Sequence, residues 1–262
     1  MNSRTAAGRL MGLLVVAMLA QGQGSDRIRA VETGLTGPVV LKGDPARRTI
    51  EERMKALNVK GVSIAVIEGY EIAWAKGYGV ADVATGRGVT PDTLFLAGSI
   101  SKPVAAIGAM ALVEQGKLKL DEDVNASLKT WKVPENEYTK QEKVTLRRLL
   151  SHMAGLTVHG FPGYAATEEV PTVRQILDGE KPANTPAVRV NMPPGQTWRY
   201  SGGGYTVAQL MMTEAAGTTF PEFMQRAVLA KAGMKQSTYE NPLPKALSSA
   251  AASGRWARRR PA

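Results

Sequence analysis

Apolar and β-branched residues fill two neighbouring stretches of the chain, Gly61–Ile67 and Ile72–Tyr78. Only Glu68-Gly69-Tyr70 separates them, and a short glycine-containing break between two such stretches is typical of a β-hairpin. Upstream, Asp44-Pro45 has the form of an N-cap followed by a first-turn proline, and apolar residues recur at helical spacing as far as Leu57. The pattern therefore predicts one amphipathic helix and then an antiparallel hairpin.

Beyond this hairpin the apolar positions follow the spacing of helices. The first of these runs from Ser99 to Gly116, and its expected buried side carries Val104, Ile107, Ala111 and Leu112. Further helical stretches are expected at Val144–Leu150, Val173–Leu177, Tyr205–Ala216 and Phe220–Gly233. Apart from the stretch at 173–177, residues 161–198 are rich in Pro, Gly and Thr, which indicates a long loop, and loops of that length are usually functional or mobile.

The first 24 residues have the pattern of an export signal. Arg4 and Arg9 give a positive start, Leu10–Ala20 is an apolar core too short for a stable membrane span, and Ala20-Gln21-Gly22 supplies small residues for cleavage. We therefore expect residues 1–24 to be a signal peptide and the mature protein to be exported, periplasmic or secreted, without a stable membrane span. The alternative is an uncleaved helix that tethers the chain to the membrane.

Composition and charge narrow the class. The chain has 262 residues, 44% hydrophobic and 21% charged, which is ordinary for a soluble globular protein with one large domain or two closely packed lobes. The formal net charge is +10, but several basic residues lie at the two ends: Arg4, Arg9, Arg255, Arg258, Arg259 and Arg260. The remaining body is mildly basic and has no basic stripe interleaved with aromatic residues, so no nucleic-acid partner is expected. The absence of cysteine excludes disulfides, thiolate catalysis and cysteine-based metal sites.

The strongest candidate chemistry lies in the stretch Phe95–Val104. Residues three apart on a helix point the same way, so Ser99 and Lys102 would place a hydroxyl next to an amine. A serine hydroxyl is a weak nucleophile until a neighbouring group takes its proton. The start of a helix also supplies unpaired N–H groups, which suit a developing oxyanion. This spacing is compatible with a serine nucleophile beside its base.

A purely structural interpretation of Ser99 competes with this one. A serine ahead of an apolar helix is more often an N-cap than a catalyst. The four residues from Ser99 to Lys102 by themselves favour the cap, because Ser-x-x-Lys is a common sequence.

The wider context supports the catalytic interpretation. Three blocks, Leu94–Pro103, Leu149–Leu156 and Arg199–Tyr205, occur in the order seen in serine beta-lactamase-like hydrolases. From roughly residue 45 to residue 253 the chain resembles this family, which includes class C beta-lactamases, D-alanyl-D-alanine carboxypeptidases and beta-lactamase-fold carboxylesterases. The resemblance implies an α/β (α+β) fold of the beta-lactamase/transpeptidase type: an antiparallel sheet flanked by helices, plus a mainly helical lobe.

The same resemblance implies a set of site residues. Ser99 would be the nucleophile, and Lys102 and Tyr200 would transfer protons, with the tyrosine oxygen facing the serine. Relatives commonly carry Tyr-x-Asn at this block, whereas position 202 is glycine here, so the amide that holds a lactam or peptide carbonyl is missing. Ser201 is expected to replace it in part as a hydrogen-bond donor, and Gly202 allows close approach of the backbone. The departure favours simple esters as substrates.

The two histidines have other expected roles. The sequence Gly-x-Ser-x-Gly does not occur, so neither histidine is expected to serve a catalytic triad. We expect His152 to make structural hydrogen bonds. His159 lies in a stretch, continuing to Gly163 and Tyr164, that is expected to shape the entrance to the cleft, and it is a candidate substrate contact. With two histidines and scattered carboxylates, no metal site is expected, and no cofactor is implied.

The family's third motif, a Lys/His-Thr-Gly or related triplet on a sheet strand, does not occur in residues 206–262. Instead the sequence becomes basic after Ala252-Ser253-Gly254. This predicts a hydrolase domain at 25–253 that lacks its C-terminal part, followed by an aberrant basic tail at 254–262. A genuine short terminus is the alternative. Loss of sheet strands would leave apolar surface uncovered on the hairpin and on the helix after Ser99.

Together these features predict an exported serine hydrolase that forms an acyl-enzyme on ester or amide carbonyls, most consistent with a carboxylesterase. A D-alanyl-D-alanine carboxypeptidase or class C-like beta-lactamase is the first alternative, and a catalytically impaired remnant that binds such ligands is the second. The expected partner is a small-molecule ester, beta-lactam or D-alanyl peptide. A basic protein that binds surfaces through its terminal arginines is the least favoured hypothesis.

Overall fold

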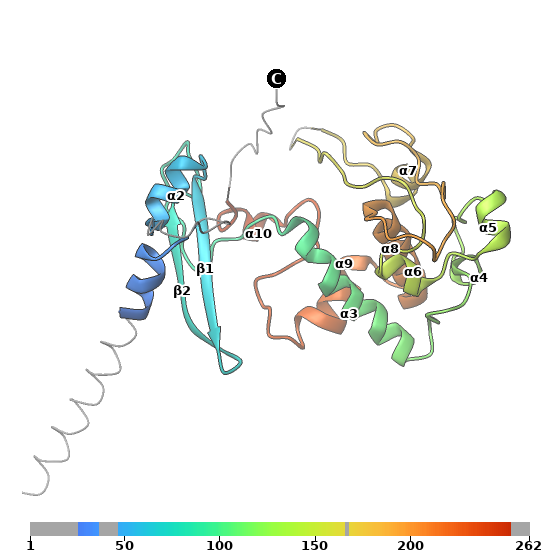
Figure 1. The fold of residues 1–262 in the computed structure, drawn as a ribbon, viewed down its shortest axis with the longest axis horizontal. Helices are drawn as coiled ribbons and strands as arrows, with labels where there is room; N and C mark the ends of the chain where they lie inside the picture. The colour runs from blue at the N-terminus through green and yellow to red at the C-terminus, as the bar shows by residue number, and fades with distance from the viewer. Residues whose placement is uncertain (1–25, 37–46, 166–167, 253–262) are drawn as a thin grey trace, which may run out of the picture. The chain divides into compact units, whose positions relative to one another are not determined.

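The structure is a computed structural model that describes residues 26–36, 47–165 and 168–252 (Figure 1). The predicted export signal at 1–24 and basic tail at 254–262 lie outside the described residues. The chain divides into two compact units, residues 1–96 with 245–262 and residues 97–244.

The first unit contains a helix at residues 26–33 and four labelled elements: α2 (Ile50–Ala56), β1 (Gly61–Glu68), β2 (Glu71–Gly79) and α10 (Lys245–Ser248). The second contains the 3₁₀ helix η1 (Gly98–Ile100), α3 (Ser101–Glu114), α4 (Val124–Ser127), α5 (Glu137–Gln141), α6 (Leu146–Leu150), α7 (Val173–Asp178), α8 (Gly202–Ala216), α9 (Phe220–Met224) and the π-helical turn η2 (Gln225–Leu229).

The predicted hairpin is confirmed. Strands β1 and β2 pair antiparallel, with Gly61 opposite Gly79 and Glu68 opposite Glu71. The two turn residues, Gly69 and Tyr70, have φ values of 58° and 67°, as a two-residue turn that matches the twist of the strands requires. Among the described residues these strands form a sheet of two, and apolar side chains on it are exposed, including Ile67 at 70% and Ile72 at 68%.

Helix α2 begins later than the sequence pattern predicted. Its N-cap is Thr49, whose hydroxyl accepts the N–H of Glu52 at 3.1 Å while the Glu52 carboxylate accepts the N–H of Thr49 at 2.8 Å. This capping box satisfies two otherwise unpaired N–H groups, so it fixes the start of the helix at Ile50. The prediction of a start after Asp44-Pro45 was wrong, and those two residues lie outside the described part of the chain.

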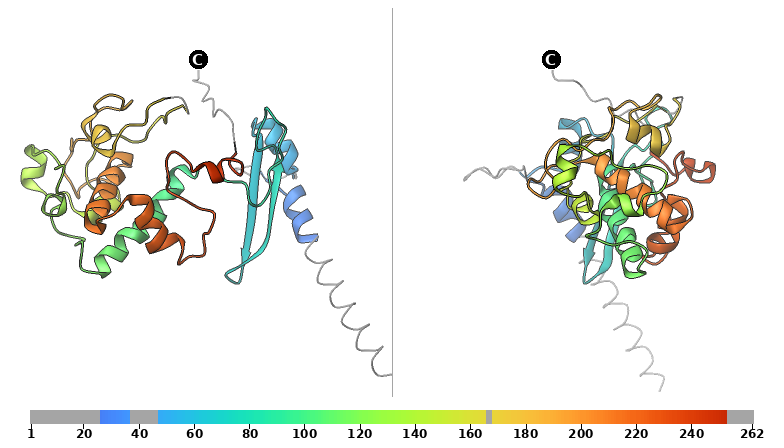
Figure 2. Two further views of the ribbon diagram at one scale, coloured as in Figure 1. Left: turned by 180° about the vertical axis from the view of Figure 1, so that it is seen from behind. Right: turned by 90° about the vertical axis from the view of Figure 1, so that its right-hand side faces the viewer.

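The core of the second unit forms where α3 packs against α8, α9 and η2 and where α6 packs against α8 (Figure 2). Side chains with less than 2% exposure fill it, among them Leu112, Leu146, Leu149, Met212 and Met224. The turn of α3 that faces α9 is made of small residues: a Cβ on Gly108 would lie 2.6 Å from the Met224 sulfur.

The predicted buried side of α3 was therefore wrong in part. Leu112 is buried as expected, but Ala105, Gly108 and Ala109 are the other buried residues of this helix. Ile107 is 58% exposed, because the close approach of α9 leaves room only for small side chains on the inner face. Helix periodicity therefore predicted the position of the helix correctly. It predicted burial of the face with the larger side chains, whereas the face with the small side chains is the one that packs.

Helices α6, α7 and α8 lie close to their predicted positions, whereas α4, α5 and α10 were not predicted. The stretch predicted as one helix at Phe220–Gly233 consists of α9 and the π-helical turn η2. Helix α6 begins at Leu146, after its N-cap Thr145, and α7 matches the predicted stretch at 173–177. Helix α8 begins at Gly202, three residues before the predicted start, and Gly217 ends it in the left-handed conformation.

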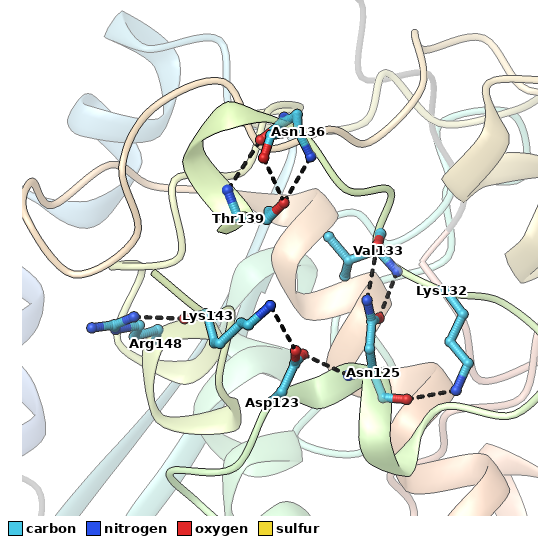
Figure 3. Close-up of polar contacts among 8 residues, drawn as sticks. All are labelled: Asp123, Asn125, Lys132, Val133, Asn136, Thr139, Lys143 and Arg148. Carbon is cyan, nitrogen blue, oxygen red and sulfur yellow. Dashed lines mark hydrogen bonds and ion pairs between the residues drawn. The ribbon is translucent and has the colours of Figure 1, made fainter. Parts of the chain in front are cut away.

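Polar side chains hold together the segment that leads from α3 to α6 (Figure 3). The Asn125 side chain donates to the Val133 carbonyl at 2.9 Å and accepts the Val133 N–H at 2.8 Å. Asn136 caps α5 by accepting the N–H groups of Tyr138 and Thr139. These local bonds define the path by which the chain returns to α6 and the following His152 segment.

Candidate active site

Ser99 and Lys102 come from two consecutive helical turns. Gly98, with φ of 54°, turns the chain into η1, which carries Ser99, and α3 follows without a break. The Lys102 Nζ donates to the Ser99 Oγ at 3.1 Å. The N-cap of α3 is Ile100, and no side chain caps it. The Ser99 hydroxyl therefore does not cap this helix, and it points to the lysine instead.

Tyr200 lies 101 residues further along the chain, and its hydroxyl donates to the Ser99 Oγ at 2.8 Å. The serine oxygen thus has a hydroxyl on one side and an ammonium on the other. Ser99 is exposed, so the group remains open to a substrate. Its own N–H belongs to the first turn of η1, where backbone N–H groups have no partner within the helix.

Residues on either side of Tyr200 anchor it to the segment after α6. The N–H of Arg199 donates to the His152 carbonyl at 2.9 Å, and the N–H of Ser201 donates to the His152 Nδ1 at 3.2 Å. The Arg199 guanidinium also donates to the Gly155 carbonyl at 2.8 Å. The backbone of His152 has φ of 60°, an uncommon value for a non-glycine residue. These contacts fix the tyrosine from both sides.

The electrostatics of the site favour proton transfer by Tyr200. Burial raises the pKa of its phenol, but the hydrogen bond with Ser99 and the nearby Lys102 ammonium outweigh burial, so the pKa is lowered overall. The Lys102 Nζ lies 5.3 Å from the centre of the Tyr200 ring and 5.7 Å from that of Tyr205. A phenol with a lowered pKa loses its proton more readily near neutral pH.

His152 has the structural hydrogen-bonding role that the sequence predicted. Its ring centre lies 4.3 Å from that of Tyr200. Burial, followed by the charges of Lys102 and His159, lowers the pKa of His152. The neutral ring is therefore favoured, which leaves Nδ1 free to accept the N–H of Ser201.

His159 is exposed, and its ring centre lies 4.9 Å from that of Tyr200. Its backbone carbonyl accepts the N–H of Gly202 at 3.1 Å, which holds the loop after residue 157 against the start of α8. The ring is therefore next to the candidate site, and a role in substrate binding stays a prediction.

Ser201 does not match its predicted role. It is only 4% exposed and is the N-cap of α8, accepting the N–H of Gly204 at 2.9 Å. Its single hydroxyl proton is donated to the Thr157 carbonyl at 2.7 Å. The expectation that Ser201 donates to a substrate is corrected for this reason.

Gly202 is buried, and a Cβ there would lie 3.1 Å from a ring carbon of Phe161 and 3.2 Å from the His159 carbonyl oxygen. The space that a side chain at 202 would fill is already occupied by this loop. The glycine therefore has a packing reason, and it is accompanied by Phe161, a residue that the sequence pattern did not single out.

One face of α8 and the first turns of α3 line a pocket of about 240 Å³. The residues that line it are Ser101, Lys102, Ala105, Phe161, Gly202, Tyr205, Thr206, Gln209, Met212, Phe220 and Tyr239. Those from α8 recur at helical spacing, and this spacing is the signal by which the sequence could have grouped Tyr205 and Gln209 with position 202. Nothing comparable marked Arg199, whose partners become neighbours only in the fold.

Neither a metal centre nor a membrane-spanning helix is found in the part of the chain that the structure describes. No group of three or more His, Cys, Asp or Glu residues is arranged to hold a metal ion there. No helix there has both the length and the apolar character needed to cross a bilayer.

The serine lies at the start of a helix in a mainly helical unit, within hydrogen-bond distance of a lysine and a tyrosine. This arrangement is the one expected for the active site of a serine beta-lactamase-fold protein. The chain belongs to the Beta-lactamase family, whose model matches residues 46–262. The fold prediction is confirmed, because solved neighbours have the beta-lactamase/transpeptidase fold.

Three relatives illustrate the similarity. Unguisins hydrolase ungD' of Aspergillus campestris is 28% identical over 75% of this chain and 37% of its own length. Esterase EstB of Burkholderia gladioli is 28% identical over 58% of this chain and 40% of its own length. The crystal structure of a Beta-Lactamase/D-Alanine Carboxypeptidase from Pseudomonas syringae has a TM-score of 0.58 and 28% identity, covering 78% of this chain and 52% of that one. The chain therefore spans about half or less of the length of each of these three proteins.

Proposed function

We propose that the protein is a serine hydrolase that forms an acyl-enzyme, with Ser99 as nucleophile and Lys102 and Tyr200 as the two groups that together make proton transfer possible. The observation that carries the proposal is the position of the Ser99 Oγ, 3.1 Å from the Lys102 Nζ and 2.8 Å from the Tyr200 oxygen. Both distances lie within reach of direct proton transfer.

In acylation, the Ser99 Oγ attacks the carbonyl carbon and its proton passes to the deprotonated oxygen of Tyr200. The bond between the carbonyl carbon and the leaving oxygen then breaks as Tyr200 donates this proton to the leaving oxygen. In deacylation, a water molecule attacks the Ser99 ester and gives one proton to Tyr200. Ser99 regains a proton as the acid product leaves. The Lys102 ammonium favours the ionised phenol and assists each transfer.

Carboxylesterase activity is the more specific proposal. Gly202 offers no side-chain amide, and the Ser201 hydroxyl already donates to Thr157, so neither residue supports the recognition of a lactam or peptide carbonyl. An ester has a better leaving group and demands less of such contacts. Similarity to an esterase supports the same choice. D-alanyl peptidase and beta-lactamase activities are the first alternatives. The last alternative is a catalytically impaired protein that binds such ligands without turnover.

The proposal extends to location and domain limits. We propose an exported, periplasmic or secreted protein with its signal peptide at 1–24, a hydrolase domain at 25–253 and a basic tail at 254–262. The apolar run at 10–20 behind Arg4 and Arg9 supports export. N-terminal sequencing of protein purified from the periplasm or medium of an expressing bacterium tests it, and an intact N-terminus in the cytoplasm contradicts it.

Intact-mass labelling with a fluorophosphonate tests the catalytic proposal. In this reaction the Ser99 Oγ forms a bond to phosphorus and fluoride leaves. The purified full chain is expected to gain one adduct, located at Ser99 by peptide mapping, and the Ser99→Ala and Lys102→Ala variants are expected to gain none. Circular dichroism of each protein distinguishes a loss of reactivity from a loss of folding. A folded parent that stays unlabelled would refute the proposal and favour the remnant. Hydrolysis of p-nitrophenyl esters, a chromogenic lactam and a D-alanyl peptide then separates the three activities.

A further inference from the structure

The pocket beside Lys102 is the feature that the proposed chemistry leaves unused. Its walls come from α3, α8, α9 and the loop that carries Phe161, all within residues 97–244. Lys102, one of the residues that line it, also contacts the Ser99 Oγ. The pocket and the candidate nucleophile therefore share Lys102 as a neighbour.

The polar atoms in its walls are largely occupied. The Tyr205 hydroxyl donates to the Leu150 carbonyl at 3.0 Å, and the Tyr239 hydroxyl donates to the Ser101 carbonyl at 2.7 Å. The Thr206 hydroxyl donates to the Gly202 carbonyl at 3.3 Å. With their hydroxyls bound to the backbone, these side chains present rings and a methyl group to the pocket.

Apolar side chains form the rest of the wall. Met212 is fully buried, and Phe220, in edge-to-face contact with Tyr239 at 5.1 Å between ring centres, is 9% exposed. Such a lining suits an alkyl chain or an aromatic ring. Ser101, Lys102 and Gln209 are the other polar residues of the lining.

The size of the pocket points to part of a substrate. Ligand sites that bury a drug-sized molecule usually measure about 300–1,000 Å³, and this pocket measures about 240 Å³. From Gly202 to Met212 the α8 wall rises by about 15 Å, at 1.5 Å per residue. A single unbranched or aromatic group fits these dimensions better than a whole polar ligand.

Tyr200 decides which part of an ester would lie there. Its hydroxyl approaches the Ser99 Oγ, and the described residues that line the pocket do not include it. Under the proposed mechanism Tyr200 returns a proton to the leaving oxygen, so the alcohol portion lies on the Tyr200 side. The acyl portion is then left for the pocket on the Lys102 side.

We propose that this pocket is the acyl-binding site, and that it selects esters with a medium-length alkyl or an aryl acyl group over acetyl esters. The assignment of the acyl portion rests on the proposed hydrolase function. The presence of an apolar binding site next to Lys102 rests on the pocket alone. The Lys102 ammonium in its lining also provides a partner for the carboxylate of the acid product.

Binding to an unreactive protein tests the pocket independently of catalysis. In the Ser99→Ala protein, octanoate is expected to bind at least about tenfold more tightly than acetate, measured by calorimetry or ligand-observed NMR. Adding Gln209→Phe, which fills the pocket from α8, is expected to weaken octanoate binding by about tenfold or more. Adding Gln115→Phe, the same change at the exposed end of α3, serves as the matched control and should leave binding unchanged. Equal binding of octanoate and acetate, or equal effects of the two phenylalanines, overturns the proposal.

A second variant guards against misfolding of the Gln209→Phe protein. Phe161 is 39% exposed on a loop, so Phe161→Ala removes one wall with little risk to the core. It should weaken octanoate binding several-fold while the melting temperature stays close to that of the parent. If octanoate binds as expected but no ester is hydrolysed, the proposed function fails and the binding site stands. If esters are hydrolysed but octanoate and acetate bind alike, the acyl site fails and the hydrolase stands.

Discussion

The two halves of the candidate site are built in different ways. Ser99 and Lys102 are three residues apart and share the start of one helix, so the fold of a few turns brings them together. Tyr200 arrives from 101 residues away and depends on contacts with His152, Gly155 and Thr157 made by its two neighbours. The first half is a local structure, and the second is a tertiary one.

The two halves of the candidate site should therefore respond differently to mutation. The serine–lysine pair should tolerate changes outside α3 and the elements packed on it, whereas the tyrosine should respond to any change that moves the segment at 152–157. The site can therefore lose its proton-transfer group while its nucleophile stays in place. Four variants or conditions test this contrast, in order of decreasing expected effect on the site.

Tyr200→Phe removes the tyrosine oxygen and leaves the ring against His152. We expect the second-order rate constant for fluorophosphonate labelling to fall by about 10²- to 10⁴-fold, the usual contribution of a general acid–base group. Stopped-flow or timed intact-mass measurements give this rate. A fall of less than twofold would mean that Lys102 alone activates Ser99 and that the tertiary half is dispensable.

Gly155→Ala strains the support of Tyr200. Gly155 has φ of 66°, and a Cβ there would lie 2.2 Å from the Met192 carbonyl oxygen. We expect the free energy of unfolding to fall by about 1–3 kcal/mol, because the left-handed backbone and the clash both penalise the side chain. The labelling rate should fall as well, since the Gly155 carbonyl is bonded to Arg199.

Gly160→Ala is the matched control for this change. Its Cβ would meet nothing within 4 Å, so stability and labelling should both stay close to those of the parent. Chemical denaturation of the two variants gives the comparison. Equal losses of stability and labelling rate in the two variants would show that position 155 does not specifically require glycine.

Acidification should loosen the same support through His152. Its pKa is lowered in the folded protein, mainly by burial, so the unfolded chain binds this proton at a higher pH than the folded chain does. The stabilisation is complete above the ordinary histidine pKa of about 6.5 and is lost as the pH falls through the lowered folded value. Urea unfolding between about pH 4 and 8 should show a steeper loss for the parent than for His152→Gln. Identical slopes would contradict the role given to Nδ1.

Thr49→Ala should have the smallest effect on the site. It removes a capping box in α2, a helix of the other unit, at a cost of about 1 kcal/mol. Hydrogen exchange of the α2 amides is expected to quicken, while the labelling rate at Ser99 stays within about twofold of the parent. A large loss of labelling would show that the site depends on this helix.

The sequence predicted the local features well because their determinants are neighbours in the chain. The hairpin at 61–79 follows from two apolar stretches and the short glycine-containing break between them, and the pairing of Ser99 with Lys102 follows from one helical turn. Tyr200 could be placed only through the resemblance to a known family. No spacing rule connects residues 101 positions apart.

The failures have equally specific causes. The inner face of α3 was misassigned because Gly108 and Ala109 are buried by the approach of α9, which periodicity does not register. The assignment of Ser201 to substrate binding failed because its hydroxyl caps α8 at Gly204 and donates to the Thr157 carbonyl. Both contacts form only in the folded chain. In both cases packing between distant segments decided the role of a residue.

The pH dependence of labelling at Ser99 shows whether Tyr200 takes the proton from Ser99. The rate for the parent should rise along a titration with a midpoint below 10.0, the ordinary pKa of tyrosine, because the pKa of Tyr200 is lowered. The same titration should vanish in Tyr200→Phe, while circular dichroism shows both proteins folded across the range. A titration with the same midpoint in parent and variant would contradict the claim that Tyr200 takes the proton from Ser99.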